Sequence, residues 1–273
     1  MDCKSCGNDH LENFCPECGE KAFNTKLLSA KHFAEETFEG LVHFDNKFFR
    51  TVKTLITMPG QLSLDYTEGR RVRYMKPIPF FLVVSLLFFF LTIGNIFSLA
   101  LYNYVTYKPF TNYNTQGIVK DKLVQAKLSM TEYEQLFNEK MTANSKEFIF
   151  IFIPFYGLVF FLLFFWKKHF FVEHLVFATH FITFILLFSL AGAYLIGIPF
   201  YLINKTQYSE HFDQFYSLFT VICFGIYLIF AVHKFYRTNF FWTILTSASV
   251  AYTFFLFIQY YRMLLFFKII WLS

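Results

Sequence analysis

Residues 172–198 read VEHLVFATHFITFILLFSLAGAYLIGI, an apolar run interrupted near its start by Glu173, His174 and His180. A helix needs about 20 predominantly apolar residues to cross a hydrocarbon core about 30 Å thick. This run is therefore long enough to span a membrane. Four further apolar runs predict spans of the same kind. They cover about residues 78–101, 147–166, 214–233 and 240–260.

The composition of the chain agrees with this interpretation. Of its 273 residues, 56% are hydrophobic, 23% aromatic and 16% charged. Soluble chains carry about 25% charged residues, so a soluble globular enzyme is excluded, and the apolar content excludes a disordered chain. The expected fold class is an all-α polytopic membrane protein with about five transmembrane helices, which make up a domain over residues 77–273.

Two C-x-x-C pairs lie near the start of the chain, separated by eight residues. They consist of Cys3, Cys6, Cys15 and Cys18. Four thiolates at this spacing suit a structural Zn²⁺ ion, because four ligands fill the tetrahedron and leave no open position for water. A glycine (Gly7, Gly19) follows each pair, where the backbone must turn its amides toward the sulfurs. We therefore expect a small zinc ribbon over residues 1–23.

Two alternatives for these cysteines are a pair of disulfides and a thioredoxin-like redox pair. A redox C-x-x-C is expected near a βαβ pattern, and the sequence has none. A zinc–thiolate site implies a reducing compartment, which places the N-terminus in the cytoplasm.

Residues 24–76 are predicted to form an amphipathic region beside the membrane. A helix from Ser29 to about Thr57 carries an apolar stripe at helical period. The stripe consists of Phe33, Thr37, Leu41, Phe44, Phe48, Val52 and Leu55. A second short helix is expected to begin at Pro59 and to run through Tyr66, with Gly69 just after its end.

Four bases and no acid follow this second helix directly before the first apolar run. They are Arg70, Arg71, Arg73 and Lys76. One interpretation is a topogenic cluster under the positive-inside rule, with an interfacial helix. The other is a binding site for anionic lipid headgroups or a phosphorylated substrate. Nucleic acid is not expected as a partner, because the net charge is only +5 and the ribbon lacks a basic, aromatic face.

The remaining short loops follow the same charge rule. Lys167 and Lys168 follow the second span, and Lys234 and Arg237 follow the fourth, whereas Lys205 is the single base of the loop 204–213. This bias predicts an inner-membrane protein with a cytoplasmic N-terminus and an external C-terminus. The last segment, Met263–Leu272, is expected either to lie along the interface or to extend the fifth helix.

Residues 102–146 are expected to form a solvated loop outside the cytoplasm. Its aromatic start suggests an interfacial belt. Ser129 and Glu132 match a capping box that opens a helix to about Met141. A binding surface for a partner is the alternative interpretation of this loop.

The start of the third span holds the candidate catalytic residues, Glu173 and His180. At 100° per residue they share a helical face with His169 and Thr183, whereas His174 points away and is interpreted as interfacial. Burial of an ionisable side chain in a membrane costs at least about 2.5 kcal/mol, so such residues are functional candidates. The structural alternative is that Glu173 caps the helix or forms an ion pair, and that His180 makes an interhelical hydrogen bond.

Three segments together resemble an uncharacterised family of bacterial zinc-ribbon multi-pass inner-membrane proteins. They are FCPECGEK at residues 14–21, the stretch from Pro59 through Tyr66–Arg71 to Pro77, and EHLVFA at residues 173–178 with His180. The resemblance covers nearly the whole chain and implies the architecture. The family carries no known activity, so the resemblance implies none here.

Three functions remain open at this stage. The first is a non-enzymatic scaffold or assembly factor whose ribbon docks a cytoplasmic protein. The second is a membrane-embedded enzyme or lipid-handling protein at the cytoplasmic interface, which would use Arg70, Arg71 and Arg73 for a phosphate and Glu173 or His180 for proton transfer. The third is a transporter or channel, for which the sequence shows no evident repeat.

Overall fold

The computed structural model describes residues 2–9, 13–20, 47–91, 97–146, 149–168, 170–204 and 210–272. These residues contain helices and no strand, apart from an isolated antiparallel bridge between Asp2 and Asp9. The all-helical class expected from the sequence is confirmed for this part of the chain. The chain divides into two compact units, one made of Met1–Leu91 with Phe152–Ala251 and the other of Thr92–Ile151 with Tyr252–Ser273.

The first unit holds most of the apolar helices. Its first three described helices are α2 (Lys47–Thr57), α3 (Gln61–Thr67) and α4 (Pro77–Leu91). They are followed by α8 (Phe152–Phe164), α9 (Phe171–Gly192), the π-helix η4 (Ala193–Gly197), α10 (Ile198–Asn204), α11 (Glu210–Tyr236) and the first part of α12 (Phe240–Leu272). Pro199, which donates no backbone hydrogen bond, follows η4, and π-turns of this kind accommodate such breaks.

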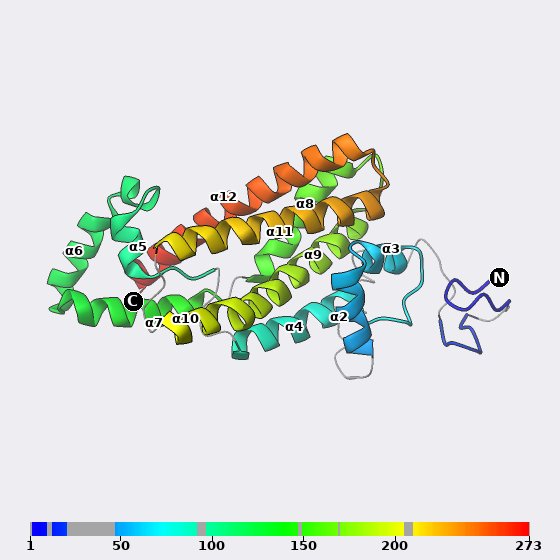
Figure 1. Cartoon of the computed structure of the whole chain (residues 1–273), viewed down its shortest axis with the longest axis horizontal. Helices are drawn as coiled ribbons and strands as arrows, with labels where there is room; N and C mark the ends of the chain where they lie inside the picture. Colours follow the sequence, from blue (N-terminus) through cyan, green and yellow to red (C-terminus); the bar gives the residue numbers. More distant parts are fainter. Residues whose placement is uncertain are drawn as a thin grey trace. The chain divides into compact units, whose positions relative to one another are not determined.

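Helix α9 forms the centre of the first unit and packs along α8 and α4 (Figure 1). The close approach of α8 to α9 depends on Gly157, since a Cβ at this position would lie 2.6 Å from the side chain of Leu175 on α9. Aromatic rings fill the interior. Phe160 meets Phe177 edge-on at 4.8 Å between centroids, and Phe164 stacks on Tyr236 at 4.0 Å. Such pairs add about 0.5–1.5 kcal/mol each beyond their buried area.

Helices α2 and α3 form a hairpin beside this core. The described part of the predicted amphipathic helix ends at Thr57 as expected, and Phe48 and Leu55 of its stripe are buried. The portion from Ser29 to residue 46 lies outside the described residues. The predicted start of α3 at Pro59 is wrong, because Gly60 adopts a left-handed φ of 81° and the helix begins at Gln61.

The end of α3 is confirmed at Gly69, which has a φ of 91°. The backbone N–H of Arg70 donates to the Asp65 carbonyl at 2.8 Å, and that of Gly69 donates to the Tyr66 carbonyl at 3.3 Å. These two bonds form a Schellman motif. The motif turns the chain sharply, so the basic residues that follow leave the helix axis.

The second unit contains the loop helices and the end of α12. They are α5 (Leu101–Thr106), the 3₁₀ helix η2 (Phe110–Tyr113), α6 (Thr115–Ala126), α7 (Met130–Asn144) and the 3₁₀ helix η3 (Ile149–Ile151). The capping box of Ser129 and Glu132 is confirmed at the start of α7. Tyr104 is a core residue of this unit and not part of an interfacial belt, because its ring stacks on Phe266 at 4.9 Å.

Within the described ranges, three helical segments are long and apolar enough to cross a membrane. They are Phe171–Phe200, Phe219–Tyr236 and Phe240–Trp271. The helices of the described residues would give a fourth span if Met130–Asn144 and Ile149–Phe164 together form one broken span. The prediction of five spans is not confirmed, because α4 has 15 residues and α8 has 13 in the described part of the chain. The segment Met263–Leu272 extends the last helix.

Candidate functional site

The four predicted metal ligands lie together in one cluster. The ligand atoms of Cys3, Cys6, Cys15 and Cys18 all lie within 4.8 Å of one another. The two C-x-x-C turns are built alike, since Gly7 N–H donates to the Cys3 carbonyl at 2.9 Å and Gly19 N–H donates to the Cys15 carbonyl at 2.8 Å. Both glycines have positive φ, 80° and 73°. Their expected role in turning the backbone is confirmed.

The sulfur positions fit a single metal ion. The Sγ atoms of Cys3 and Cys18 are 3.4 Å apart and those of Cys6 and Cys15 are 3.5 Å apart. Four thiolates about 2.3 Å from a tetrahedral Zn²⁺ would lie about 3.8 Å from each other. A disulfide requires about 2.05 Å, and all four thiols are free. A set of four sulfurs suits zinc or iron.

The local backbone favours the thiolate at one of the four cysteines, Cys15, whereas burial and the neighbouring sulfurs leave the pKa values of Cys6 and Cys18 raised. A hydrogen bond from the backbone of Cys18 lowers the pKa of the Cys15 thiol to about 6. A thiol must lose its proton to bind a metal, so few protons compete with a metal at this sulfur near neutral pH. The four cysteines would hold the ion, and the ion would cross-link the two C-x-x-C turns.

Residues 2–9 and 13–20, which we name the cysteine module, are held to the chain after α3 by Glu20. The side chain of Glu20 is only 5% exposed. Its Oε2 accepts hydrogen bonds from the backbone N–H of Arg71 at 2.8 Å, the N–H of Val72 at 3.0 Å and the Oγ of Ser5 at 2.6 Å. Bonds to a carboxylate are stronger than neutral ones. Glu20 therefore links the module to the basic segment, a link that the sequence alone did not reveal.

The three predicted arginines have different surroundings. Arg70 binds the Asp65 carboxylate through Nε at 2.8 Å and Nη2 at 2.6 Å, and it also contacts Glu68 at 2.6 Å. Burial acts to lower the pKa of Arg70, but the bonds to these two carboxylates outweigh it and leave the pKa raised. The charge of Arg70 is thus neutralised within the protein.

Arg71 lies over the Tyr66 ring at 4.4 Å and donates from Nε to the Tyr66 carbonyl at 3.1 Å. Arg73 lies 5.6 Å from the centre of the Tyr74 ring and is exposed. Among the residues that the structure describes, Arg73 forms no ion pair. Of the three arginines, Arg73 is the one whose positive charge is open to an external anion.

Three basic segments were predicted to share one side of the membrane, and the structure brings residues of all three to one end of the first unit. They are residues 70–76, residues 167–168, and Lys234 with Arg237. Glu68 contacts both Arg70 and Arg237, the latter at 3.0 Å. His174 lies between the Lys168 carbonyl and the Tyr236 hydroxyl, at 3.1 and 3.0 Å from its two ring nitrogens. These contacts join segments far apart in sequence, so the bases gather at one end of the first unit.

Glu173 has a structural role at the start of α9. Its Oε2 accepts a hydrogen bond from the Phe170 backbone N–H at 3.2 Å, and its Oε1 lies 3.3 Å from Lys168 Nζ. A carboxylate in the first turn also interacts favourably with the helix dipole. The interpretation of His174 as interfacial is wrong, since its side chain is fully buried between α9 and α11.

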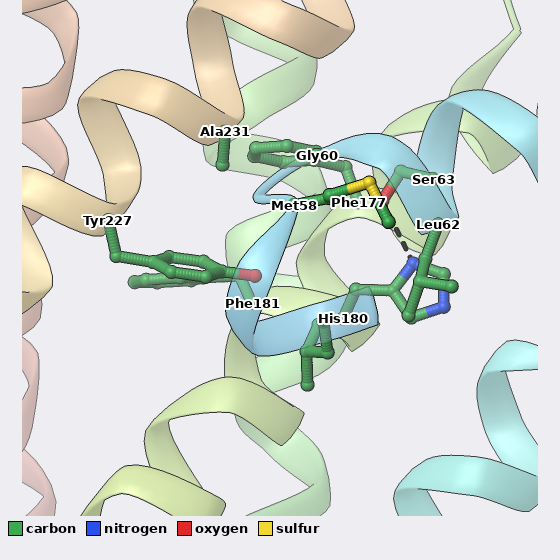
Figure 2. Close-up of a pocket in the computed structure, with 10 residues that line it drawn as sticks. Met58, Gly60, Leu62, Ser63, Phe177, His180, Phe181, Tyr227 and Ala231 are labelled. Atoms are coloured by element: carbon green, nitrogen blue, oxygen red, sulfur yellow. Dashed lines mark hydrogen bonds between the residues drawn. The ribbon is translucent and has the colours of Figure 1, made fainter. Parts of the chain in front are cut away.

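His180 reaches a partner on α3. Its Nδ1 lies 2.9 Å from Ser63 Oγ, and the two residues are 4% and 1% exposed. Figure 2 shows the two side chains pointing toward one another from α9 and α3. The cavity beside them has a volume of about 10 Å³, which is room for about one water molecule. Among the residues around it are Met58, Gly60, Phe177, Tyr227 and Ala231.

Glu173 and His180 do not form a joint site, because each is bonded to a different element. His169, which was predicted to share their helical face, lies outside the described residues. Ser63 and Tyr236 were missed as the histidine partners, because nothing in their sequence spacing relates them to α9. Helix α12 contributes further buried hydroxyls, such as Thr243 and Thr246, which bond within their own turns.

Comparison with protein families gives one match. Residues 45–89 match a family described as Protein of unknown function (DUF3667). The matched segment covers α2, α3, the arginines and most of α4. No curated protein and no solved structure matches the chain. The chain is therefore similar over this segment to a family of unknown function, and the match assigns no activity. It includes one of the three segments that carry the resemblance, the stretch from Pro59 to Pro77, and it does not reach the cysteines or α9.

Proposed function

We propose that this chain is an integral membrane scaffold or assembly factor whose cysteine module binds a structural Zn²⁺ ion and docks a cytoplasmic protein. The observation that carries the proposal is the closure of the site around His180. His180, the strongest catalytic candidate, is bonded to Ser63 beside a cavity of only about 10 Å³. A substrate larger than water has no room there.

The other ionisable residues of α9 support the same conclusion. Glu173 caps its helix and pairs with Lys168, while His174 bonds Tyr236 and the Lys168 carbonyl. Both of these ionisable side chains thus have partners within the protein, as a stable packed site requires. The alternative, an enzyme or lipid-handling protein at the cytoplasmic interface, would need a second arrangement of these side chains. A transporter or channel is the third possibility.

The proposed orientation places the cysteine module in the cytoplasm of a bacterial cell, at the inner membrane. The clustering of Arg70, Lys168 and Arg237 at one end of the first unit supports it. A zinc–thiolate module also requires a reducing compartment. With five spans, the C-terminus and the loop 102–146 would lie outside.

The cysteine module offers a specific contact surface for a partner. Phe14, beside the ligand Cys15, is 56% exposed. An exposed aromatic ring on a rigid support is a frequent anchor of protein interfaces. Because Glu20 fixes the module to the membrane-proximal segment, a partner that binds Phe14 would be held at the membrane surface.

Site-specific photo-crosslinking tests this proposal. A photoreactive amino acid at Phe14 in living cells is expected to capture one defined cytoplasmic protein, identified by mass spectrometry. The same amino acid at Lys53, an exposed residue of α2, is the positional control. The capture should disappear when Cys15→Ser and Cys18→Ser are added. Equal capture from both positions, or capture that survives loss of the cysteines, would refute docking through the metal module.

The scaffold proposal and the enzyme alternative predict different effects of replacing His180 on α9. His180→Asn preserves a polar atom near Nδ1, so we expect a folded protein with unchanged crosslinking at Phe14. If this variant folds normally but loses the cellular phenotype of the wild-type gene, a catalytic role for His180 is supported and the scaffold proposal fails.

A further inference from the structure

A second, larger cavity lies between the cysteine module and the hairpin of α2 and α3, all within the first unit. Its volume is about 430 Å³, which is in the range of about 300–1,000 Å³ typical of small-molecule sites. Polar and aromatic side chains dominate its wall. Among them are Ser5, Gln61, Asp65, Arg70, Arg73 and Tyr74. Met58 lines both this cavity and the small cavity beside His180, but His180 does not line the larger one.

The charges around this cavity leave one open cation. Arg70 is neutralised by Asp65 and Glu68, so it shapes the wall without attracting an anion strongly. Arg73 is exposed, rests against the Tyr74 ring and, within the described residues, forms no ion pair. A guanidinium presents several N–H donors in a planar fork that matches phosphate oxygens.

The uncharged polar side chains extend the site beyond a single anion. Ser5 Oγ donates to Glu20 and keeps its lone pairs as acceptors. Gln61 Nε2 donates to Asp65 Oδ1 at 2.7 Å, which fixes the orientation of its amide. A ligand that carries hydroxyl groups next to a phosphate would therefore find hydrogen-bond partners in the cavity that Arg73 also lines.

The position of the cavity in the chain relates it to the membrane. Arg73 precedes α4, an apolar helix that begins at Pro77. Bases directly before an apolar helix lie at the depth of lipid headgroups, where each contributes about 1 kcal/mol to attraction by anionic lipid. The cavity is thus placed where a headgroup can enter from the membrane surface.

We propose that this cavity binds a phosphate ester with adjacent hydroxyl groups, held by Arg73 and by the wall that Ser5 and Gln61 provide. The ligand is either an anionic lipid headgroup or a soluble phosphate ester of the same chemistry. The site goes beyond docking of a protein partner, and it does not depend on such a partner. Because Ser5 lies between the ligands Cys3 and Cys6, the wall is complete only when the cysteine module is in place.

Native mass spectrometry of the purified, metal-loaded full chain in a neutral detergent tests the site. The probes are phosphatidylglycerol, phosphatidylcholine as the zwitterionic control, and glycerol 3-phosphate as the soluble form. We expect binding of phosphatidylglycerol or of glycerol phosphate, and the tighter of the two identifies the source. Phosphatidylcholine should bind at least about tenfold more weakly, since it carries no net negative charge.

Two variants that each remove one positive charge distinguish binding in the cavity from general electrostatic attraction to the protein. Arg73→Gln is expected to weaken binding about tenfold or more, and Arg73→Lys to restore part of it, whereas Lys53→Gln on α2 should leave it within about twofold. Equal losses in Arg73→Gln and Lys53→Gln would overturn the proposal, as would equal binding of both lipids or no binding of either phosphate probe. Arg73 is exposed, so the variant should fold, and its unfolding temperature checks this.

Discussion

Ser63 and His180 lie 117 residues apart in sequence, and Ser63 Oγ is 2.9 Å from His180 Nδ1 in a buried contact between α3 and α9. This bond fastens the hairpin of α2 and α3 to the central apolar helix. Loss of one partner would leave the other polar group buried without a hydrogen bond, which costs about 1–3 kcal/mol. The pair is therefore a stability determinant in our interpretation, and not an acid–base couple.

A double-mutant cycle measures this contact. Ser63→Ala and His180→Phe should each destabilise the protein, and the double variant should lose less than the sum of the two, because no unpaired group remains. The measurement is unfolding of the purified chain in detergent. Strictly additive losses would contradict a direct bond between these side chains.

Glu20 provides the second prediction. Glu20→Ala should speed hydrogen exchange at the Arg71 and Val72 amides by about tenfold or more, since bonds to a charged acceptor contribute about 1.5–3 kcal/mol. Metal content should stay the same, because Glu20 is not a ligand. Glu17→Ala, which removes an exposed carboxylate of the same module, is the control. Unchanged exchange in Glu20→Ala would show that the module is not held by this carboxylate.

Gly60 supports the third prediction. Its φ is 81°, and a Cβ there would lie 2.5 Å from the Ala231 carbonyl oxygen of α11. A left-handed conformation alone costs an L-residue about 1–2 kcal/mol, so Gly60→Ala should destabilise the first unit by more than that amount. Gly225→Ala on α11 meets open space and should be neutral or stabilising. Similar unfolding temperatures for the two variants would contradict the close approach at Gly60.

The fourth prediction concerns pH and the capping box of α7. Side-chain and backbone hydrogen bonds to Ser129 hold the pKa of Glu132 below its ordinary value of 4.5. A lowered pKa in the folded state stabilises it above pH 4.5, and this contribution disappears as the pH falls through the lowered pKa. Protection of the first turn of α7 from hydrogen exchange, corrected for intrinsic rates, should therefore decrease as the pH is lowered below the ordinary pKa of 4.5.

Two variants check whether Glu132 causes the acid-dependent loss of protection. Glu132→Ala should lack the extra protection at neutral pH and show no further acid-dependent loss. Glu139→Ala, an exposed carboxylate later in the same helix, should behave as the wild type. An acid-dependent loss that persists in Glu132→Ala would assign it to another group.

Much of this structure could be predicted from the sequence, because its signals are local. The C-x-x-C spacing with Gly7 and Gly19, the Gly69 helix end and the Ser129 capping box each depend on residues a few positions apart. The corresponding turns and caps are found in the structure. The long apolar runs likewise indicated the helices of α9, α11 and α12.

The rest depends on contacts between distant segments, which periodicity does not report. Hydropathy counts apolar residues without showing where a helix breaks, so α4 and α8 were expected to be longer than the 15 and 13 residues described. His174 was assigned to the interface because its partner Tyr236 comes 62 residues later. For the same reason the sequence did not predict the hydrogen bonds that the Arg71 and Val72 amides donate to Glu20.

The proposal for the cysteine module depends first on the identity and amount of its metal. Elemental analysis of the purified full chain, combined with its native mass, measures both directly. We expect about one zinc ion per chain, and loss of that ion when Cys15 and Cys18 are replaced by serine. Less than about half an equivalent of zinc, or iron in its place, would contradict the zinc-loaded docking module.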